Sequence, residues 1–268
     1  MGTANNLEFQ IRRNEQKIMP PPTLALLHGF LGFSHRGPIE YFRGVGQMLR
    51  KMDIAYLIPE VPPAGTVAER AEALARQLFR SDAPVFTLIA HSMGGLDARY
   101  LIAHLDPDRR IKSLLTIATP HHGSPLATWF LESYSPIPIW VRSIGSRGLR
   151  ELTPEVRAAM PIPDREDVAY SSYAGCRPPD ELTFLLRSYG RIIPEDNDGM
   201  VPVSSAQWGK FRGVIRADHV EFIGWNLGLP NARSTRPFNH IDFWVQVVAE
   251  AMAGAKGKIS AGGSNGAE

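Results

Sequence analysis

The chain has 268 residues, of which 44% are hydrophobic and 21% are charged, and its formal net charge is +2. This composition is ordinary for a globular enzyme, and so small a charge excludes the strongly basic surface that nucleic-acid binding requires. The single cysteine, Cys176, excludes an intrachain disulfide and favours a reducing compartment.

Residues 1–22 are polar and end in three prolines, which predicts a stiff N-terminal lead-in without the apolar core of a signal peptide. No stretch approaches the roughly 18–20 apolar residues of a transmembrane helix. We therefore expect a cytoplasmic protein with no transmembrane segment. An exported form whose signal has been removed is the alternative.

The first buried strand is predicted at residues 23–27, Thr-Leu-Ala-Leu-Leu. It leads into His28-Gly29-Phe30-Leu31-Gly32, where two glycines around bulky apolar residues indicate a loop with unusual backbone angles. We expect His28 to brace this loop through hydrogen bonds.

Strands and helices then alternate. A strand is predicted at residues 54–58, and a helix follows from Thr66 to about Phe79, beginning with a capping box formed by Thr66 and Glu69. Further apolar runs at residues 85–89 and 111–117 predict two more strands. The alternation predicts an α/β fold with a mostly parallel sheet and functional residues at the carboxyl ends of its strands.

Ser92 lies between the strand at 85–89 and a helical pattern that continues to about residue 102. A serine on such a strand–turn–helix is typical of a nucleophile elbow, which is strained and needs small flanking residues. Ala90 and Gly94 meet that need. The alternative reading of Ser92 is an ordinary turn serine.

The pattern breaks at residues 126–160, where aromatic and aliphatic residues are interleaved with prolines. The segment is too apolar for a solvent loop and too broken for a core strand. We interpret it as a cap, or lid, inserted over the active site. The alternative is a helical hairpin packed permanently on the sheet.

After the cap, residues 168–175 predict another strand and residues 241–252 an amphipathic helix covering the sheet. Residues 253–268 are rich in Gly, Ser, Ala and Lys, and we expect a disordered tail. Residues 23–252 are thus predicted to form a single domain that includes the cap.

A nucleophilic serine needs a histidine to accept its proton. In α/β-hydrolases the order along the chain is Ser, then an acid, then His, so only His219 and His240 lie late enough. His219 follows another apolar segment and is preferred, whereas His240 begins the last helix and reads as a cap or surface residue. His91 adjoins Ser92, and we expect its side chain to point the other way.

The histidine needs a carboxylate to hold its tautomer. Asp198 lies in an Asp-Gly turn, a geometry that lets a carboxylate project from a strand end. Asp196, two residues earlier, is the main rival. Either aspartate could instead simply form the turn.

These segments together resemble the bacterial and fungal triacylglycerol lipases. The resemblance rests on His28–Gly32, Ala90–Tyr100, Leu115–Pro125, Asn197–Val201 and Asp218–His219, in the order of that family. It implies an α/β-hydrolase fold, carboxylic-ester hydrolysis and a mobile lid. It also implies a Ser92–Asp198–His219 triad, with the backbone N–H groups of Phe30 and Met93 as oxyanion-hole donors.

Several of these lipases bind a structural calcium near the catalytic histidine. Glu221 lies two residues after His219, but no second ligand can be placed, so calcium is not predicted and neither is any other metal or cofactor. His121 and His122 have no carboxylate or cysteine at ligand spacing.

The sequence thus predicts a serine ester hydrolase that acts on acyl esters of lipid type through an acyl-enzyme, with lipid-interface contact through the cap and no nucleic-acid partner. Because the same triad serves a thioesterase or an acyltransferase, those activities are alternatives. A non-catalytic binding protein on the hydrolase scaffold is the remaining alternative.

Overall fold

The computed structural model describes residues 22–36, 39–134, 136–184, 186–225 and 238–264. The lead-in expected over residues 1–22 therefore lies outside the described residues, apart from Pro22.

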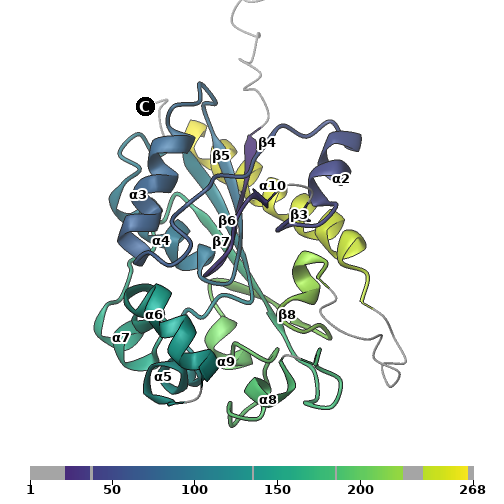
Figure 1. Cartoon of the computed structure of the whole chain (residues 1–268). Helices are drawn as coiled ribbons and strands as arrows, with labels where there is room; N and C mark the ends of the chain where they lie inside the picture. Colours follow the sequence, from purple (N-terminus) through teal and green to yellow (C-terminus); the bar gives the residue numbers. More distant parts are fainter. Residues whose placement is uncertain (1–21, 37–38, 135, 185, 226–237, 265–268) are drawn as a thin grey trace, which may run out of the picture.

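A six-stranded parallel sheet forms the centre of the molecule (Figure 1). Its strands, in spatial order, are β4 (Tyr56–Leu57), β1 (Thr23–Leu27), β5 (Phe86–His91), β6 (Ile111–Ile117), β7 (Ala169–Gly175) and β8 (Lys210–Ile215). Every neighbouring pair is parallel. The predicted parallel sheet is confirmed, although the strand expected at residues 54–58 is shorter, Tyr56–Leu57, and lies at the edge of the sheet. A separate two-stranded antiparallel ladder joins β2 (His35–Arg36) and β3 (Ile39–Glu40).

Helices cover both faces of the sheet. On one face, α3 (Val67–Leu78) and α4 (Gly94–His104) bury apolar side chains against β1, β5 and β6. On the other face lie α2 (Val45–Lys51) and α10 (His240–Ser264). The predicted capping box begins α3, because Thr66 accepts from the Glu69 N–H and the Glu69 carboxylate accepts from the Thr66 N–H.

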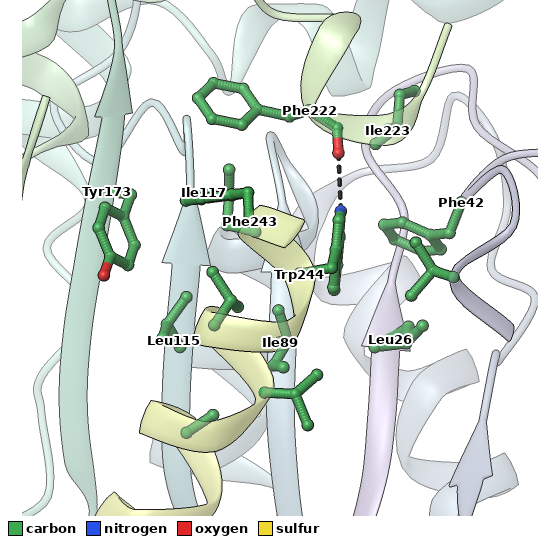
Figure 2. Close-up of a cluster of buried hydrophobic side chains, with 14 of the residues drawn as sticks. Leu26, Phe42, Ile89, Leu115, Ile117, Tyr173, Phe222, Ile223, Phe243 and Trp244 are labelled. Carbon is green, nitrogen blue, oxygen red and sulfur yellow. Dashed lines mark hydrogen bonds between the residues drawn. The ribbon is translucent and has the colours of Figure 1, made fainter. Parts of the chain in front are cut away.

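The core beneath α10 is tied to the loop that follows β8. Trp244 of α10 is fully buried, and its indole N–H donates to the carbonyl of Phe222 at 2.7 Å (Figure 2). Phe42, Phe243 and the strand residue Ile89 surround this contact. The loop after β8 is therefore anchored both by apolar packing and by a hydrogen bond.

The tail expected to be disordered from Ala253 is instead helical to Ser264, so that prediction is wrong for residues 253–264. Small residues explain the difference. Ala255 is fully buried, and a Cβ at Gly254 would lie 3.1 Å from Oγ of Ser113 on β6. Small residues thus permit close helix–sheet contact here, and this packing, together with the high helix propensity of alanine, outweighs the low helix propensity of glycine.

Three helices follow β6 and lie together at one end of the sheet (Figure 1). They are α5 (Pro125–Glu132), α6 (Pro136–Arg150) and α7 (Pro154–Ala159), and they occupy the segment predicted to be the cap. α6 is broken at Gly145, whose backbone angles are not helical (φ −152°, ψ 28°). Among the described residues, no helix has the length and apolarity to cross a bilayer.

Candidate active site

Ser92 occupies the sharp turn between β5 and α4. Its φ of 56° lies in the left-handed region, which is strained for a residue with a side chain. The turn is held because the Ser92 N–H donates to the carbonyl of Ile117 at 3.0 Å and its own carbonyl accepts from the Thr119 hydroxyl at 2.7 Å. A Cβ at Gly94 would lie 2.8 Å from the carbonyl oxygen of His28, so only glycine fits there. The strained turn expected of a nucleophile elbow is present.

The loop after β1 lies beside Ser92 and is held from behind by Arg70 of α3. The Arg70 guanidinium donates to the carbonyl oxygens of His28 at 2.8 Å and Gly29 at 3.3 Å. The described residues contain no cis peptide bond, and in a trans peptide the C=O and the following N–H point in opposite directions. Because the Gly29 carbonyl faces Arg70, the N–H of Phe30 faces away from it.

Arg70 is held in turn by Asp97 of α4. The two side chains form an ion pair at 2.8 Å, and neither residue is more than 1% exposed. Burial raises the pKa of Asp97 to about 6 against the opposing effect of the Arg70 charge. Sequence reasoning missed this pair. Arg70 follows Val67 by three residues and precedes Leu74 by four, so its place on the buried stripe of α3 was the available signal.

Asp198 and His219 are brought into direct contact. Nδ1 of His219 lies 2.7 Å from Oδ2 of Asp198, and the His219 N–H donates to the Asp198 carbonyl at 2.9 Å. The other carboxylate oxygen of Asp198, which is fully buried, accepts from the backbone N–H groups of Met200 and Val201. The carboxylate is thus fixed by the backbone on one side and faces the imidazole on the other.

The rival residues lie elsewhere. Asp196 is exposed, although it is only two residues from Asp198. His240 begins α10, and its Nε2 is 2.9 Å from the carbonyl of Arg43. Neither side chain borders the cavity that contains Ser92 and His219.

Ser92 and His219 line one cavity of about 240 Å³. Phe30 also borders it, and its remaining walls are largely apolar. The cap contributes Leu126, Ala127, Phe130, Val141, Leu149 and Leu152. Helices of the segment predicted to be a cap therefore form part of the cavity wall.

The cap makes close contact with the loop after β1. A Cβ at Gly145 would lie 2.6 Å from Cζ of Phe30 and 2.9 Å from Cβ of Ala64. The break in α6 thus falls where the helix approaches Phe30. A residue larger than glycine at position 145 would force either α6 or the Phe30 side chain to move.

Phe30 and Met93 were predicted to supply the oxyanion-hole N–H groups. Within the described residues, neither N–H has a hydrogen-bond partner. Met93 follows Ser92 immediately at the start of α4, where backbone N–H groups have no carbonyl of their own helix to bond. One of these unpaired donors follows Ser92 directly. The other lies on the loop after β1, where a Cβ at Gly29 would be 3.1 Å from Oγ of Ser92.

His91 differs from its prediction, because it does not point away from the site. It lines the same cavity as Ser92, and its ring centroid lies 4.6 Å from that of His219. The buried Tyr41 hydroxyl accepts from the Gly29 N–H at 3.0 Å and lies 2.8 Å from Nδ1 of His91. Nε2 of His91 is 3.0 Å from the carbonyl of His219.

This chain of contacts assigns the donors. Because the Tyr41 hydroxyl accepts from Gly29, its own proton goes to Nδ1 of His91, and Nε2–H then donates to the His219 carbonyl. Burial, followed by the nearby His219, lowers the pKa of His91 well below its ordinary value, which keeps Nδ1 free to accept. The loop after β1 is thereby connected to the backbone of His219.

Two other histidines are structural. His28 donates from Nδ1 to the Gly29 carbonyl at 3.1 Å, and burial and the charge of Arg70 lower its pKa to about 4. His121 is stacked on Trp208, and burial, then Arg99, lowers its pKa well below the ordinary value. Both side chains therefore stay neutral in the pH range in which an ordinary histidine begins to take up a proton.

The residues around His219 do not fit a calcium site. Glu221, the carboxylate considered for it, forms a two-pronged ion pair with Arg177, at 2.6 and 2.9 Å. In the described part of the chain, no three His, Cys, Asp or Glu side chains are grouped as a metal site would require. A guanidinium therefore lies where a cation would have to bind.

Comparison with known proteins shows similarity to lipases. Residues 74–137 match the family of the PGAP1-like alpha/beta domain. Triacylglycerol lipase 2 of Saccharomyces cerevisiae is 31% identical over 212 residues, which is 70% of this chain and 63% of the yeast protein. A triacylglycerol lipase of Pseudomonas fragi is 33% identical over 108 residues, 39% of this chain and 36% of that lipase. The chain thus spans less than two thirds of the length of either relative.

Solved structures give the same fold. A metagenomic carboxyl esterase superposes with a TM-score of 0.69 at 18% identity, covering 87% of this chain and 76% of the esterase. The Staphylococcus hyicus lipase superposes with a TM-score of 0.66 at 16% identity, covering 91% and 98%. At these identities the likeness establishes the architecture alone.

Proposed function

We propose that the chain, which has an α/β-hydrolase fold and is similar in sequence to triacylglycerol lipases, hydrolyses carboxylic esters of lipid type, with Ser92, His219 and Asp198 as its catalytic triad. One observation carries the proposal. The strained Ser92 turn and the His219 imidazole, held 2.7 Å from a buried aspartate, border a single apolar cavity.

In this mechanism the Ser92 hydroxyl attacks the ester carbonyl while Nε2 of His219 accepts its proton. Asp198 stabilises the resulting imidazolium through Nδ1–H, and the fixed carboxylate holds the ring in that tautomer. His219 then protonates the leaving alcohol, and an acyl-enzyme on Ser92 is left. Water, activated by His219 in the same way, releases the carboxylic acid.

The N–H groups of Phe30 and Met93 would stabilise the oxyanion of each tetrahedral intermediate. Both are unpaired within the described residues, so no protein hydrogen bond has to break when the oxyanion forms. The loss of one such donor costs roughly 2.7–4 kcal/mol of transition-state stabilisation.

The cavity supports an acyl-chain substrate. Its cap side is formed by aliphatic and aromatic side chains, including Leu126, Phe130 and Leu149. Burial of a substrate methylene in such surroundings contributes about 0.8 kcal/mol. We therefore expect kcat/KM to rise with acyl length until the cavity is filled.

Two measurements test the proposal. The first treats the protein with a p-nitrophenyl alkylphosphonate and identifies the modified residue by mass spectrometry. The second measures initial rates on p-nitrophenyl esters from C2 to C16, above and below their solubility, with an acyl-CoA series in parallel.

We expect a phosphonate adduct on Ser92 and faster cleavage of oxygen esters than of acyl-CoA. Preferential acyl-CoA cleavage would favour the thioesterase alternative instead. A correctly folded protein without an adduct at Ser92 would favour the binding-protein alternative and contradict the proposal.

A further inference from the structure

Arg177 is a buried cation that the mechanism above does not use. It follows β7 by two residues and is 2% exposed. Its guanidinium binds Glu221 through Nε at 2.6 Å and Nη2 at 2.9 Å, and Nη1 lies 3.3 Å from the Glu181 carboxylate. A guanidinium so far removed from water, held in a planar two-pronged pair, has a fixed position.

The backbone of the same residue contacts the segment that carries the acid. The Arg177 N–H donates to the carbonyl of Asn197 at 3.1 Å, one residue before Asp198. The preceding N–H, from Cys176, donates to Ile215 at the end of β8, where the chain leads to His219. These two hydrogen bonds therefore fix the backbone at Arg177 independently of the ion pair that its side chain forms with Glu221.

Glu221 connects Arg177 to the loop that carries His219. It lies two residues after His219, and its Oε2 accepts from the Asp218 N–H at 2.8 Å, one residue before the histidine. The Asp218 carboxylate accepts from the N–H groups of Val220 and Glu221 and from the N–H of Thr183. The residues on both sides of His219 are thus connected to the Arg177–Glu221 pair.

Several carboxylates surround Arg177 or lie on the loops that it connects. Asp198 and Asp218 are fully buried, Glu221 pairs with Arg177, and Glu181 follows Arg177 by four residues and also pairs with it. Arg216 also pairs with Glu181, but its side chain is 59% exposed. Arg177 is consequently the buried positive charge that joins these acidic loops.

We propose that Arg177 is a positioning residue, an internal cation that holds the Asp198 loop and the His219 loop in catalytic register, in place of a bound metal. The idea rests on the proposed triad. It extends that triad by assigning a residue that touches neither the substrate nor the reacting atoms. It also implies that activity does not depend on a divalent cation.

The test compares Arg177→Met with Arg216→Met. The second variant removes an exposed arginine that also pairs with Glu181. We expect Arg177→Met to lower kcat by a factor on the order of 10 to 100 with little change in KM, because a misplacement of about 1 Å in a catalytic group has effects of this size. Arg216→Met should retain near wild-type kcat. Chelator should leave the wild-type rate unchanged.

A second variant separates positioning from stability. Arg177→Met combined with Glu221→Gln removes the ion pair as a unit and leaves no unpaired buried charge, so folding should recover. We expect its melting temperature to approach the wild-type value while kcat stays low. In Arg177→Ala, added guanidinium chloride at low concentration should restore part of the lost kcat, and it should not do so in Arg177→Met, where methionine fills the space.

A readout independent of catalysis is the downfield proton resonance of the His219–Asp198 hydrogen bond, assigned by its loss in His219→Gln. It should broaden or vanish in Arg177→Met and persist in Arg216→Met, whether or not the wild type hydrolyses esters. Failure of the proposed function would appear instead as no phosphonate adduct on wild-type Ser92. Wild-type kcat and an intact resonance in Arg177→Met, or full kcat in the double variant, would overturn the inference.

Discussion

Asp198 faces His219 with one carboxylate oxygen, at 2.7 Å, while its other oxygen is held by two backbone N–H groups. The acid therefore cannot rotate without losing bonds to Met200 and Val201. This arrangement favours the tautomer in which Nδ1 carries the proton and Nε2 is free to act as a base.

Asp198→Asn should lower kcat by a factor on the order of 10³–10⁴, because an amide can hold the imidazole in the wrong tautomer. Asp196→Asn is the matched control, since Asp196 lies in the same turn but is exposed. Steady-state rates on a p-nitrophenyl ester would measure both. Equal losses in the two variants would show that the turn, rather than the carboxylate at 198, matters.

The strained backbone of Ser92 predicts a difference between two inactive variants. Ser92→Ala keeps a Cβ at φ 56°, whereas Ser92→Gly relieves the steric cost of that angle. We expect the glycine variant to be more stable than the alanine variant by about 1 kcal/mol in urea unfolding. The reverse order would mean that the turn carries no such strain.

Arg70→Met should lower kcat about 10-fold or more, because the Gly29 carbonyl loses one of its donors. It keeps Nδ1 of His28 and one backbone N–H as donors, but the peptide that carries the Phe30 N–H is less firmly oriented. It should also destabilise the fold by about 3–5 kcal/mol, since Asp97 becomes an unpaired buried charge. Steady-state kinetics and thermal unfolding measure the two effects.

Arg76→Met is the control for Arg70, because Arg76 lies on the same helix with its side chain 62% exposed. The double variant Arg70→Met with Asp97→Asn should recover stability without recovering kcat. If it recovers both, the role of Arg70 is limited to compensating the charge of Asp97.

Tyr41→Phe should destabilise the protein by about 1–3 kcal/mol, because the Gly29 N–H and Nδ1 of His91 lose their buried partner. Urea unfolding would measure this loss. Tyr134→Phe, on a side chain that is 89% exposed, should have no measurable effect. A neutral Tyr41→Phe would indicate that the connection between Gly29 and His91 does not stabilise the fold.

Buried titratable groups predict how stability depends on pH. His28, His91 and His121 stay neutral in the folded protein, with a pKa of about 4 for His28 and lowered values for the others, but titrate near 6.5 when unfolded. As pH falls below 6.5, unfolding therefore takes up protons and stability decreases. Asp97 and Asp218 oppose this, because burial raises their folded pKa values to about 6 from 3.8.

The three histidines outnumber the two aspartates, so stability should fall on acidification from pH 7 to pH 5. Urea unfolding at pH 5, 6 and 7 would measure the slope of stability against pH. His121→Gln should remove the contribution of His121 to the proton uptake and flatten that slope. An unchanged slope would mean that His121 is already charged in the folded protein.

The sequence predicted the parallel sheet and Ser92 because these depend on local patterns, namely short apolar runs and small residues beside the turn. It also singled out Asp198 and His219 from their order along the chain. Their contact depends on two loops that meet only in three dimensions, and their catalytic roles stay predictions.

Local patterns were less informative where the surroundings of a side chain are formed by segments that are distant in sequence. Arg177 looks like an ordinary surface arginine in the sequence, and Arg70 differs from one only by its position on the buried stripe of α3. In the structure each is buried and pairs with a carboxylate from another element. His91 was expected to face away, yet the carbonyl of His219, 128 residues later, holds it in the site. The C-terminal residues were expected to be disordered because they are rich in Gly, Ser, Ala and Lys. Composition alone does not reveal the sheet surface on which residues 253–264 pack as a helix.

The approach of Gly145 to Phe30 brings a helix of the predicted cap into contact with the residue proposed to supply one oxyanion-hole donor. A displacement of α6 would remove the side-chain support of Phe30 at the same moment as it opened a path for substrate. Under the proposed function, entry of the substrate and support of this oxyanion donor would then occur one after the other.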